Sequence, residues 1–309
     1  MDQNSRIYVA GHQGLVGTAI CRRLRKLGYT SLILRTRDQL DLRNRAQVDQ
    51  FIHTERPDYV FLAAAKVGGI HANQNFPAEF IFDNLSIQTN LIDASWRGGV
   101  RKLQFFGSSC MYPKQAPQPI REDHLLSGEL ESTSAPYAMA KIAGITMAEA
   151  YRRQYGFCAT SIVPANLYGP GDNFDVEKSH VVPALIRRFH EAKIAGTPRV
   201  EVWGSGGARR EFLHVDDLAG AAVFLMQTYD GADLVNIGTG TDTGIGELAS
   251  MIADITGYGG EILFDAAKPD GTPGRLLDIT RLTSLGWRSG IPVREGLQQT
   301  YEWFVQTLA

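Results

Sequence analysis

The sequence predicts an α/β protein that is built on a doubly wound parallel sheet and carries a smaller α/β substrate-binding domain. Short apolar runs alternate with amphipathic stretches through the first half of the chain, and parallel strands need such helical crossovers between them. A glycine-rich turn directly follows the first apolar run. The chain has 309 residues and is 44% hydrophobic, which suffices for one large domain or two modest ones.

The expected strands of this sheet are short apolar runs. They cover residues 6–10, 31–35, 59–64, 101–106 and 159–164. The expected helices lie between them, at residues 15–27, 45–55, 76–96 and 136–155. Gly28 is a stop signal for the first helix, while Ser134 as N-cap and Pro136 in the first turn begin the last one.

The regular alternation of apolar strands with helices ends after about Leu167. We expect a helix at 181–193, a strand at 200–203, a loop rich in Gly and Arg at 204–210, a helix at 245–256 and a turn at 270–274. A helix at 216–228 and a strand at 234–237 are expected to return to the first sheet. Residues 1–167 with about 212–240 therefore form the predicted nucleotide-binding domain, and about 168–211 with 241–309 form the predicted substrate domain.

Charge and composition argue against several classes of protein. The net charge is -2, and no basic face or tail suits nucleic acid or an anionic membrane. No apolar stretch approaches the roughly 18 residues that a membrane span needs. The first five residues are polar, unlike a signal peptide. Three cysteines, at positions 21, 110 and 158, lack the spacing of disulfide or metal sites. We therefore expect a cytoplasmic protein.

Gly11, Gly14 and Gly17 predict a nucleotide-binding turn. Glycines at this G-x-x-G-x-x-G spacing let the backbone turn tightly and approach a pyrophosphate, which the following helix N-terminus attracts. An ordinary glycine-rich turn is the alternative, but the position between a strand and a helix favours a dinucleotide and hence a Rossmann domain.

The end of the second strand bears on the cofactor. An NAD enzyme usually has an acidic residue there for the ribose 2′-hydroxyl. This chain has Arg35 and Arg37, which suit the 2′-phosphate of NADPH, although Asp38 keeps NAD open and a solvated basic turn is the plain alternative. Asp41 and Leu42 lie where an adenine edge could be read.

Ser108, Tyr137 and Lys141 predict a site that protonates a carbonyl oxygen as hydride arrives. Tyr137 and Lys141 are one turn apart at a helix start and so share a face. A Lys ammonium beside a phenol lowers the phenol pKa from about 10 towards neutrality. Ser108 follows a strand, where its hydroxyl would polarise the same carbonyl. A surface pair on a helix is the alternative for Tyr137 and Lys141.

Cys110 and His180 add a second acid/base pair that simple carbonyl reduction does not require. A small buried thiol and a polar helix-start residue are the alternatives for them. Because carbons that flank a ketone are acidic, a thiol and an imidazole could exchange protons there and epimerise a keto sugar before its reduction.

These motifs resemble the extended short-chain dehydrogenase/reductase family, and within it the GDP-L-fucose synthase group of 3,5-epimerase/4-reductases. The resemblance covers essentially the whole chain. Its carriers are residues 9–17, 34–38, 62–70, 107–113, 136–144 and 210–217. The Ser-Ser-Cys-x-Tyr-Pro block at 108–113, together with the Ala-Ala-Lys-Val-Gly-Gly block at 64–69, is specific to this group.

The resemblance implies the roles of the remaining residues. Ser108, Tyr137 and Lys141 would reduce C4 of a GDP-4-keto-6-deoxy sugar, and Cys110 and His180 would epimerise C3 and C5. Ser108, Ser109, Arg188, Trp203 and Arg210 would hold the GDP-sugar. The cofactor would be NADP (NADPH), bound by Gly11, Gln13, Gly14, Leu15, Val16, Gly17, Arg37, Asp41, Leu42, Ala63, Ala64, Tyr137, Lys141, Pro164, Asn166, Leu167 and His180. A homodimer would form through the helices at 76–96 and 136–155.

The chain departs from this group at a few positions. Gln13 stands where relatives often have an Arg for the 2′-phosphate, Ala165 replaces a Thr, and Gly171 and Gly274 replace a His and a basic residue. Rival interpretations are a GDP-L-colitose synthase, which would invert only C5 of a 3,6-dideoxy ketone, and a non-catalytic NADP-binding regulator. A 4,6-dehydratase is disfavoured because Ser109-Cys110-Met111 replaces its Thr-Asp-Glu.

Overall fold

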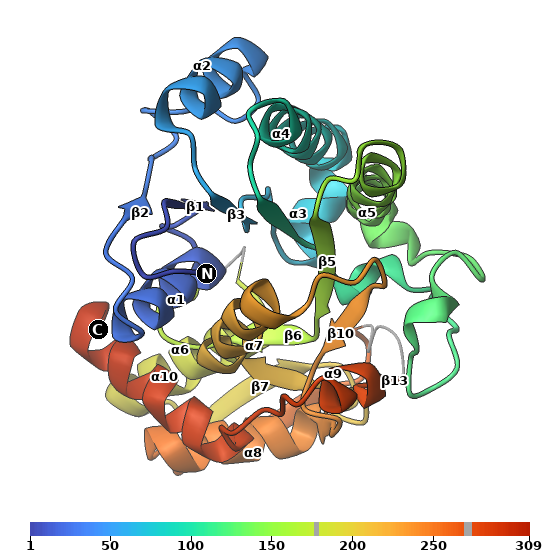
Figure 1. Cartoon of the computed structure of the whole chain (residues 1–309). Helices are drawn as coiled ribbons and strands as arrows, with labels where there is room; N and C mark the ends of the chain where they lie inside the picture. Colours follow the sequence, from blue (N-terminus) through green and yellow to red (C-terminus); the bar gives the residue numbers. More distant parts are fainter. Residues whose placement is uncertain (176–178, 269–273) are drawn as a thin grey trace.

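A six-stranded parallel sheet forms the centre of the larger lobe (Figure 1). The computed structural model describes residues 1–175, 179–268 and 274–309. The strand order is β10-β5-β4-β3-β1-β2, and every neighbouring pair is parallel. The strands are β1 (Ile7–Ala10), β2 (Leu32–Ile33), β3 (Tyr59–Leu62), β4 (Lys102–Phe106), β5 (Ala159–Pro164) and β10 (Val235–Ile237). The predicted doubly wound parallel sheet is therefore confirmed.

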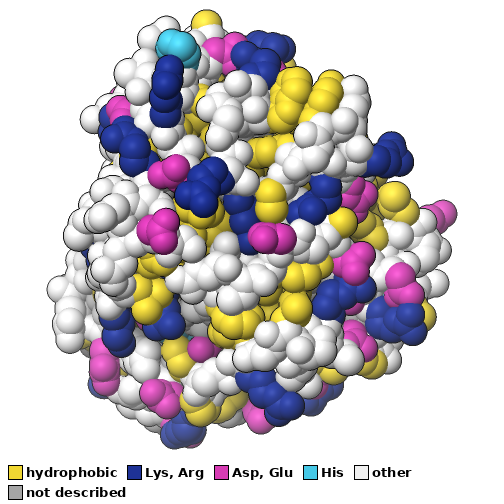
Figure 2. Space-filling view, in the orientation of Figure 1, with side chains coloured by type: hydrophobic (Ala, Val, Ile, Leu, Met, Phe, Trp, Pro, Cys, Tyr) yellow, Lys and Arg dark blue, Asp and Glu magenta, His cyan; other side chains and the backbone are white. Residues whose placement is uncertain are grey.

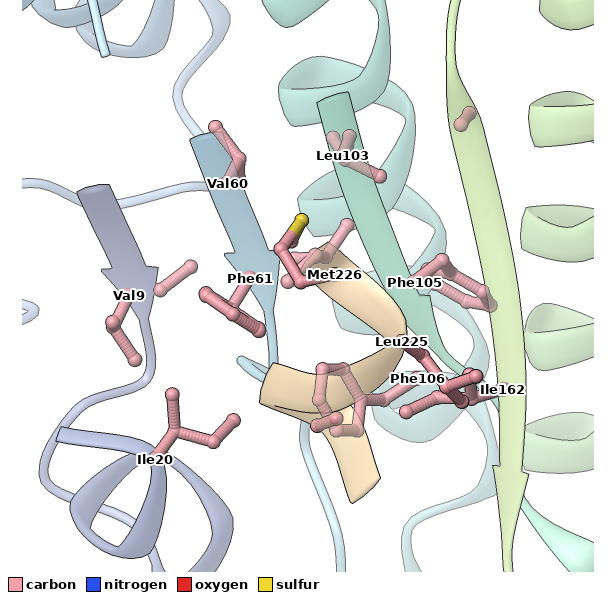
Figure 3. Close-up of a cluster of buried hydrophobic side chains, with 14 of the residues drawn as sticks. Val9, Ile20, Val60, Phe61, Leu103, Phe105, Phe106, Ile162, Leu225 and Met226 are labelled. Atoms are coloured by element: carbon pink, nitrogen blue, oxygen red, sulfur yellow. The ribbon is translucent and has the colours of Figure 1, made fainter. Parts of the chain in front are cut away.

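Helices cover both faces of this sheet, which explains why its strands read as continuous apolar runs. On one face α1 packs against α7, and on the other α4 packs against α2 and α5 (Figure 1). These helices are α1 (Leu15–Lys26), α2 (Arg45–Glu55), α4 (Pro77–Arg97), α5 (Ala135–Tyr155) and α7 (Val215–Thr228). Figure 3 shows the core between the central strands and Ile20 of α1 with Leu225 and Met226 of α7.

The chain runs from β1 towards one edge of the sheet and from β3 towards the other. Open parallel sheets bind ligands at such a switch point, beyond the carboxyl ends of the strands. The switch point here lies between Gly11, after β1, and Ala63–Ala64, after β3, so the fold places the predicted nucleotide turn in that crevice.

The second lobe has its own hydrophobic cluster. Its helices are α6 (Val181–Ala195), α8 (Ile245–Thr256) and α10 (Val293–Thr307). Its short sheets pair β7 (Arg199–Trp203) with β12 (Glu261–Asp265), and β8 (Arg209–Arg210) with β11 (Thr243–Gly244) and β13 (Gly274–Arg275). A third pair, β6 (Asn166–Tyr168) with β9 (Phe212–His214), follows the end of β5.

Several elements were not predicted from the sequence. They are α3 (Ile70–Asn75), α9 (Thr280–Ser284), α10, the one-turn helices η1 (Ser109–Met111), η2 (Glu122–His124) and η3 (Ser132–Ser134), and the strands β6, β8, β9, β11, β12 and β13. The turn predicted at 270–274 lies outside the described residues, apart from Gly274, which begins β13. Among the described helices, none combines the length and apolar character of a membrane span.

Candidate active site

The glycine turn closes tightly against the end of β3. Gly11 has a φ of +83°, and a Cβ there would lie 2.8 Å from the Cα of Ala64. A Cβ on Gly17 would lie 2.1 Å from the carbonyl oxygen of Gly11. Gly14 caps α1, and the first turn of that helix contains no acidic side chain. The turn thus leaves a helix N-terminus open to an anionic group, and these contacts fit a dinucleotide pyrophosphate.

The two arginines after β2, Arg35 and Arg37, have different surroundings. Arg35 pairs with Glu55 at 2.5 Å and lies over the ring of Phe51, whereas Arg37 is exposed. Arg37 is therefore the arginine that remains available for a cofactor phosphate. Asp41 binds Arg43 at 2.7 Å, a hydrogen-bonded pairing that lowers the pKa of Asp41 to about 2. Leu42 beside it is buried.

The turn after β4 and the first turn of α5 bring three predicted catalytic residues together. Ser108 caps η1, and its Oγ accepts a hydrogen bond from the Cys110 amide at 3.3 Å. Helix α5 packs on η1 and presents Tyr137 from its first turn. The Tyr137 phenol interacts with both the Ser108 hydroxyl and the Cys110 thiol.

Lys141 is 4% exposed and lies on the same face of α5. Its Nζ donates a hydrogen bond to the carbonyl oxygen of Phe106 at 2.8 Å. Nζ also lies 4.9 Å from the ring centroid of Phe105 and 5.9 Å from that of Tyr137. Burial lowers the pKa of Lys141 to about 7, so its charge titrates near neutrality.

The Tyr137 pKa differs from the sequence-based expectation. Burial raises the pKa of the phenol and the Cys110 thiol raises it further, whereas the hydrogen bond with Ser108 lowers it. The expected lowering of this pKa by Lys141 is wrong: burial makes the phenolate costly, and Ser108 is the group whose interaction lowers the Tyr137 pKa. In the protein alone, Tyr137 is therefore held as a protonated donor.

Cys110 and His180 come from different lobes. Cys110 is a half-buried free thiol in η1. His180 is the N-cap of α6 and is exposed as a residue, although protein atoms crowd its imidazole. Desolvation by the surrounding protein lowers the pKa of His180, which favours the neutral imidazole.

The predicted substrate residues lie mostly in the second lobe. Arg188 on α6 donates to the carbonyl oxygen of Glu201 at 2.6 Å. Trp203 ends β7, is 63% exposed and has the ammonium of Lys268 at 5.5 Å from its ring. Arg210 lies in β8. Ser109 is the exception, because it is buried in the catalytic turn of the larger lobe.

The turn after β5 joins the two lobes. Pro164 ends β5, while Asn166 and Leu167 belong to β6. Both the backbone amide and the side chain of Asn166 donate to the carbonyl oxygen of Glu211, at 3.2 and 3.1 Å. The predicted nicotinamide turn is thus fixed against the strand that follows Arg210.

Sequence reasoning missed two buried residues beside this site. Arg275 is 8% exposed and donates to the carbonyl oxygen of Ser109. Glu211 is fully buried and accepts three backbone hydrogen bonds. The sequence signal was an acidic residue between Arg210 and an apolar strand; Arg275 had no signal of its own.

Two further features lie apart from these residues. A hollow between α6 and α10 is lined by residues that include Asp172, Phe174, His190 and Trp303, and it contains none of the predicted site residues. The described residues hold no group of His, Cys, Asp or Glu side chains suited to a metal ion.

Proteins similar to this chain act on sugar nucleotides. Residues 7–238 match the NAD dependent epimerase/dehydratase family. The probable GDP-L-fucose synthase 1 of Oryza sativa subsp. japonica is 55% identical over 99% of this chain and 94% of its own length. The GDP-L-fucose synthase of Escherichia coli K12 is 52% identical over 97% of each chain. The GDP-L-colitose synthase of Yersinia pseudotuberculosis is 36% identical over 97% of this chain and 98% of its own.

Solved structures agree with these relatives. A GDP-mannoheptose C4 reductase from Campylobacter jejuni with NADP bound superposes with a TM-score of 0.93 at 42% identity and covers 99% of each chain. A GDP-L-fucose synthetase from Naegleria fowleri bound to NADP gives a TM-score of 0.91 at 28% identity, covering 99% of this chain and 95% of that one.

Proposed function

This chain belongs to the NAD dependent epimerase/dehydratase family, and we propose that it works within that family as a GDP-L-fucose synthase. It would convert GDP-4-keto-6-deoxy-D-mannose to GDP-L-fucose by epimerisation at C3 and C5 and reduction at C4. The observation that carries the proposal is the meeting of the Ser108–Cys110 turn with Tyr137 and Lys141. Identities of 52–55% to synthases, against 36% to a colitose synthase, favour this substrate.

The residues around the glycine turn fit NADPH. Gly11 and Gly17 would let the pyrophosphate approach the backbone, the start of α1 would attract it, and Arg37 would meet the 2′-phosphate. Asp41 and Leu42 would contact adenine, Ala63 and Ala64 would line the crevice, and the 164–167 turn would lie by the nicotinamide. When bound, NADPH supplies the hydride for C4.

The chain's own groups handle the protons of the reduction. Tyr137 Oη donates a proton to the C4 oxygen, and Ser108 Oγ donates a hydrogen bond to the same oxygen, which lowers the cost of its developing negative charge. The Lys141 ammonium stabilises the phenolate that remains. Because burial lowers the pKa of Lys141 to about 7, its Nζ both holds and releases a proton near neutral pH.

Cys110 and His180 would perform the epimerisations. One removes a proton from the carbon beside the C4 ketone and the other returns a proton to the opposite face. The enolate between these steps is stabilised by the hydrogen bond from Ser108. We assign the base to Cys110, a half-buried free thiol, and the acid to His180, because a lowered pKa makes its protonated imidazole a readier proton donor.

The GDP-sugar would be held mainly by the second lobe. Arg188 and Arg210 would pair with the diphosphate, Trp203 would offer its exposed face, and Ser109 would contact the sugar. In the proposed division, 1–167 with about 212–240 binds the cofactor, while about 168–211 with 241–309 binds the GDP-sugar. The working protein would be a cytoplasmic homodimer that joins through α4 and α5.

The decisive experiment is NADPH oxidation at 340 nm with GDP-4-keto-6-deoxy-D-mannose, with NADH in parallel and NMR of the product. Formation of GDP-L-fucose is expected, and the ratio of the two cofactors would show what Gln13 changes. Turnover only of the 3,6-dideoxy ketone would identify a colitose synthase instead. Tight NADPH binding without turnover of either ketone would identify a regulator.

A further inference from the structure

Arg275 places a buried positive charge behind the catalytic turn. Its side chain is 8% exposed, and its Nη1 donates a hydrogen bond to the carbonyl oxygen of Ser109. That oxygen belongs to the peptide bond that joins Ser109 to Cys110. It also accepts the amide of Tyr112 at 3.2 Å, the bond that closes η1. The Arg275 guanidinium therefore binds the 108–111 turn at Ser109, between the two proposed reactive side chains, Ser108 and Cys110.

The segment that carries Arg275 is itself held in place by Glu211. The buried Glu211 carboxylate accepts the amide of Leu277 at 2.8 Å, and the Glu211 amide donates to the carbonyl oxygen of Arg275 at 3.3 Å. The same carboxylate also accepts the amides of Thr239 and Gly240, at 2.6 and 2.8 Å. Arg275 thus projects from a segment whose backbone is held by Glu211 at both Arg275 and Leu277.

Strand pairing connects this segment to the substrate lobe. In β13, Arg275 lies opposite Arg210 of β8, and the two strands are parallel. Paired residues of parallel strands project to the same face, so Arg275 and Arg210 emerge together. Arg275 contacts the catalytic turn, while Arg210 is the proposed ligand of the GDP-sugar.

We propose that Arg275 is a positioning residue, whose guanidinium holds the 108–111 turn in its working geometry and ties it to the strand pair that carries Arg210. Arg275 itself touches no reacting atom in this arrangement. It acts through Ser109, and so on Ser108 and Cys110 together. The kinetic part of this inference rests on the proposed function, whereas the structural part does not.

Hydrogen exchange in the free protein tests the structural part. Arg275→Met removes the donor, so the amides of 108–112 should exchange faster than in the wild type, with the central sheet unchanged. The matched control is Arg209→Met, because Arg209 neighbours Arg210 on β8 but pairs with Asp242 at 2.8 Å and is about half exposed. Unchanged exchange at 108–112 in Arg275→Met would overturn the proposal.

Steady-state kinetics test the consequence. Misplacing catalytic groups by about 1 Å costs on the order of 100-fold in rate, so Arg275→Met should lower kcat by about 10–100-fold. Both deuterium uptake from solvent and NADPH oxidation should fall, with KM little changed, and Arg275→Lys should recover part of the loss. A raised KM at normal kcat would place Arg275 on the substrate and reject the positioning role.

Two controls separate the possible failures. If Arg275→Met does not fold, Arg275→Lys decides alone, because a lower kcat at constant KM supports the role and the reverse rejects it. If the wild type does not turn over GDP-4-keto-6-deoxy-D-mannose, the proposed function fails. The hydrogen-exchange experiment still tests whether Arg275 holds the 108–111 turn.

Discussion

The proposed reaction uses the positive charge of the Lys141 ammonium, although burial of this side chain disfavours that charge. The ammonium has one carbonyl acceptor, Phe106, and two aromatic rings around it, and its pKa falls to about 7. Tyr137 beside it is held protonated for the same reason, since burial disfavours the phenolate. The two side chains thus share one buried, low-dielectric environment, where a protonated phenol lies beside a lysine whose charge titrates near pH 7.

Replacing this lysine should stabilise the fold and abolish reduction. A Lys pKa that is lower in the folded than in the unfolded state costs stability below pH 7, and the cost disappears as pH rises from 7 towards 10.5. Lys141→Met should therefore raise the free energy of unfolding at pH 7 by about 1–3 kcal/mol, with a smaller gain at pH 10. Urea unfolding at the two pH values measures this. An equal gain at both would show that the charge is not the cause.

Cys110 should be needed for epimerisation and Tyr137 for reduction. Cys110→Ser keeps the size of the side chain but gives a far weaker base, so deuterium uptake from solvent at C3 and C5 should be lost. Tyr137→Phe removes the proton donor, so uptake should largely persist while NADPH oxidation falls by about 100-fold or more. Proton NMR of the sugar follows both. Normal uptake in Cys110→Ser would remove the thiol from the proposed pair.

At the scale of elements, the strand–turn–helix unit of β1 and α1 depends on two close backbone approaches. Gly17, in the first turn of α1, faces the carbonyl oxygen of Gly11, and Gly11 faces Ala64. Side chains at these positions would separate the helix from the sheet. Gly14 differs, because a Cβ there would lie at an ordinary 3.5 Å from the Gly11 oxygen.

Gly17→Ala should therefore destabilise the protein without cofactor, and Gly14→Ala should not. The added methyl at Gly17 would overlap the Gly11 oxygen, and overpacking of this kind costs about 1–3 kcal/mol. Thermal unfolding of the apo-protein compares the two variants. Equal melting temperatures for Gly17→Ala and the wild type would show that the turn can relax.

The sequence predicted the large elements because each has a pattern of its own. The strands of the central sheet are continuous apolar runs, and α5 has Ser134 at its N-cap position, although without a side-chain cap hydrogen bond, and a proline in its first turn. By contrast, β8, β11 and β13 contain two residues each, too few for any period. Helix α10 buries Gly296 and Thr300 beside Leu297 and Phe304, so small and polar residues interrupt its apolar spacing.

The candidate site likewise contains residues that a sequence pattern predicts and residues that no pattern predicts. Ser108, Tyr137 and Lys141 were predicted because their spacing has chemical meaning within one strand end and one helix turn. Arg275 could not be predicted, since its partner is a backbone carbonyl 166 residues away. The direction of the Tyr137 pKa shift also needed the structure, because it depends on burial that no spacing reveals.

At the scale of the whole molecule, α4 and α5 expose apolar side chains on the outer side of the larger lobe. Phe82 on α4 is 65% exposed, and Met139 and Tyr155 on α5 are 47% and 45% exposed. Trp96 stacks on Tyr155 with ring centroids 4.0 Å apart. In Figure 2, hydrophobic side chains gather in the upper region where these helices lie. Such a surface suits the proposed pairing of two chains.

Phe82→Glu should separate the proposed dimer. A charge placed in an apolar interface is left without water, which opposes association. Light scattering during size exclusion should show the mass falling to the 34.0 kDa of one chain. Ile194→Glu is the matched control, because Ile194 is 72% exposed on α6 in the other lobe. A wild type that already runs at one chain's mass would end the dimer proposal.

The position of β10 in the sheet order affects how the protein is made. β10 completes the larger lobe by pairing with β5. Most of the chain between these two strands, from Pro164 to Val235, belongs to the second lobe or forms α7. A growing chain on the ribosome must therefore carry an unfinished sheet, with the outer side of β5 unpaired, until Val235 to Ile237 emerge. Exposed strand edges recruit other chains. Slow translation across this stretch would then lengthen the time during which the open edge of β5 can recruit other chains.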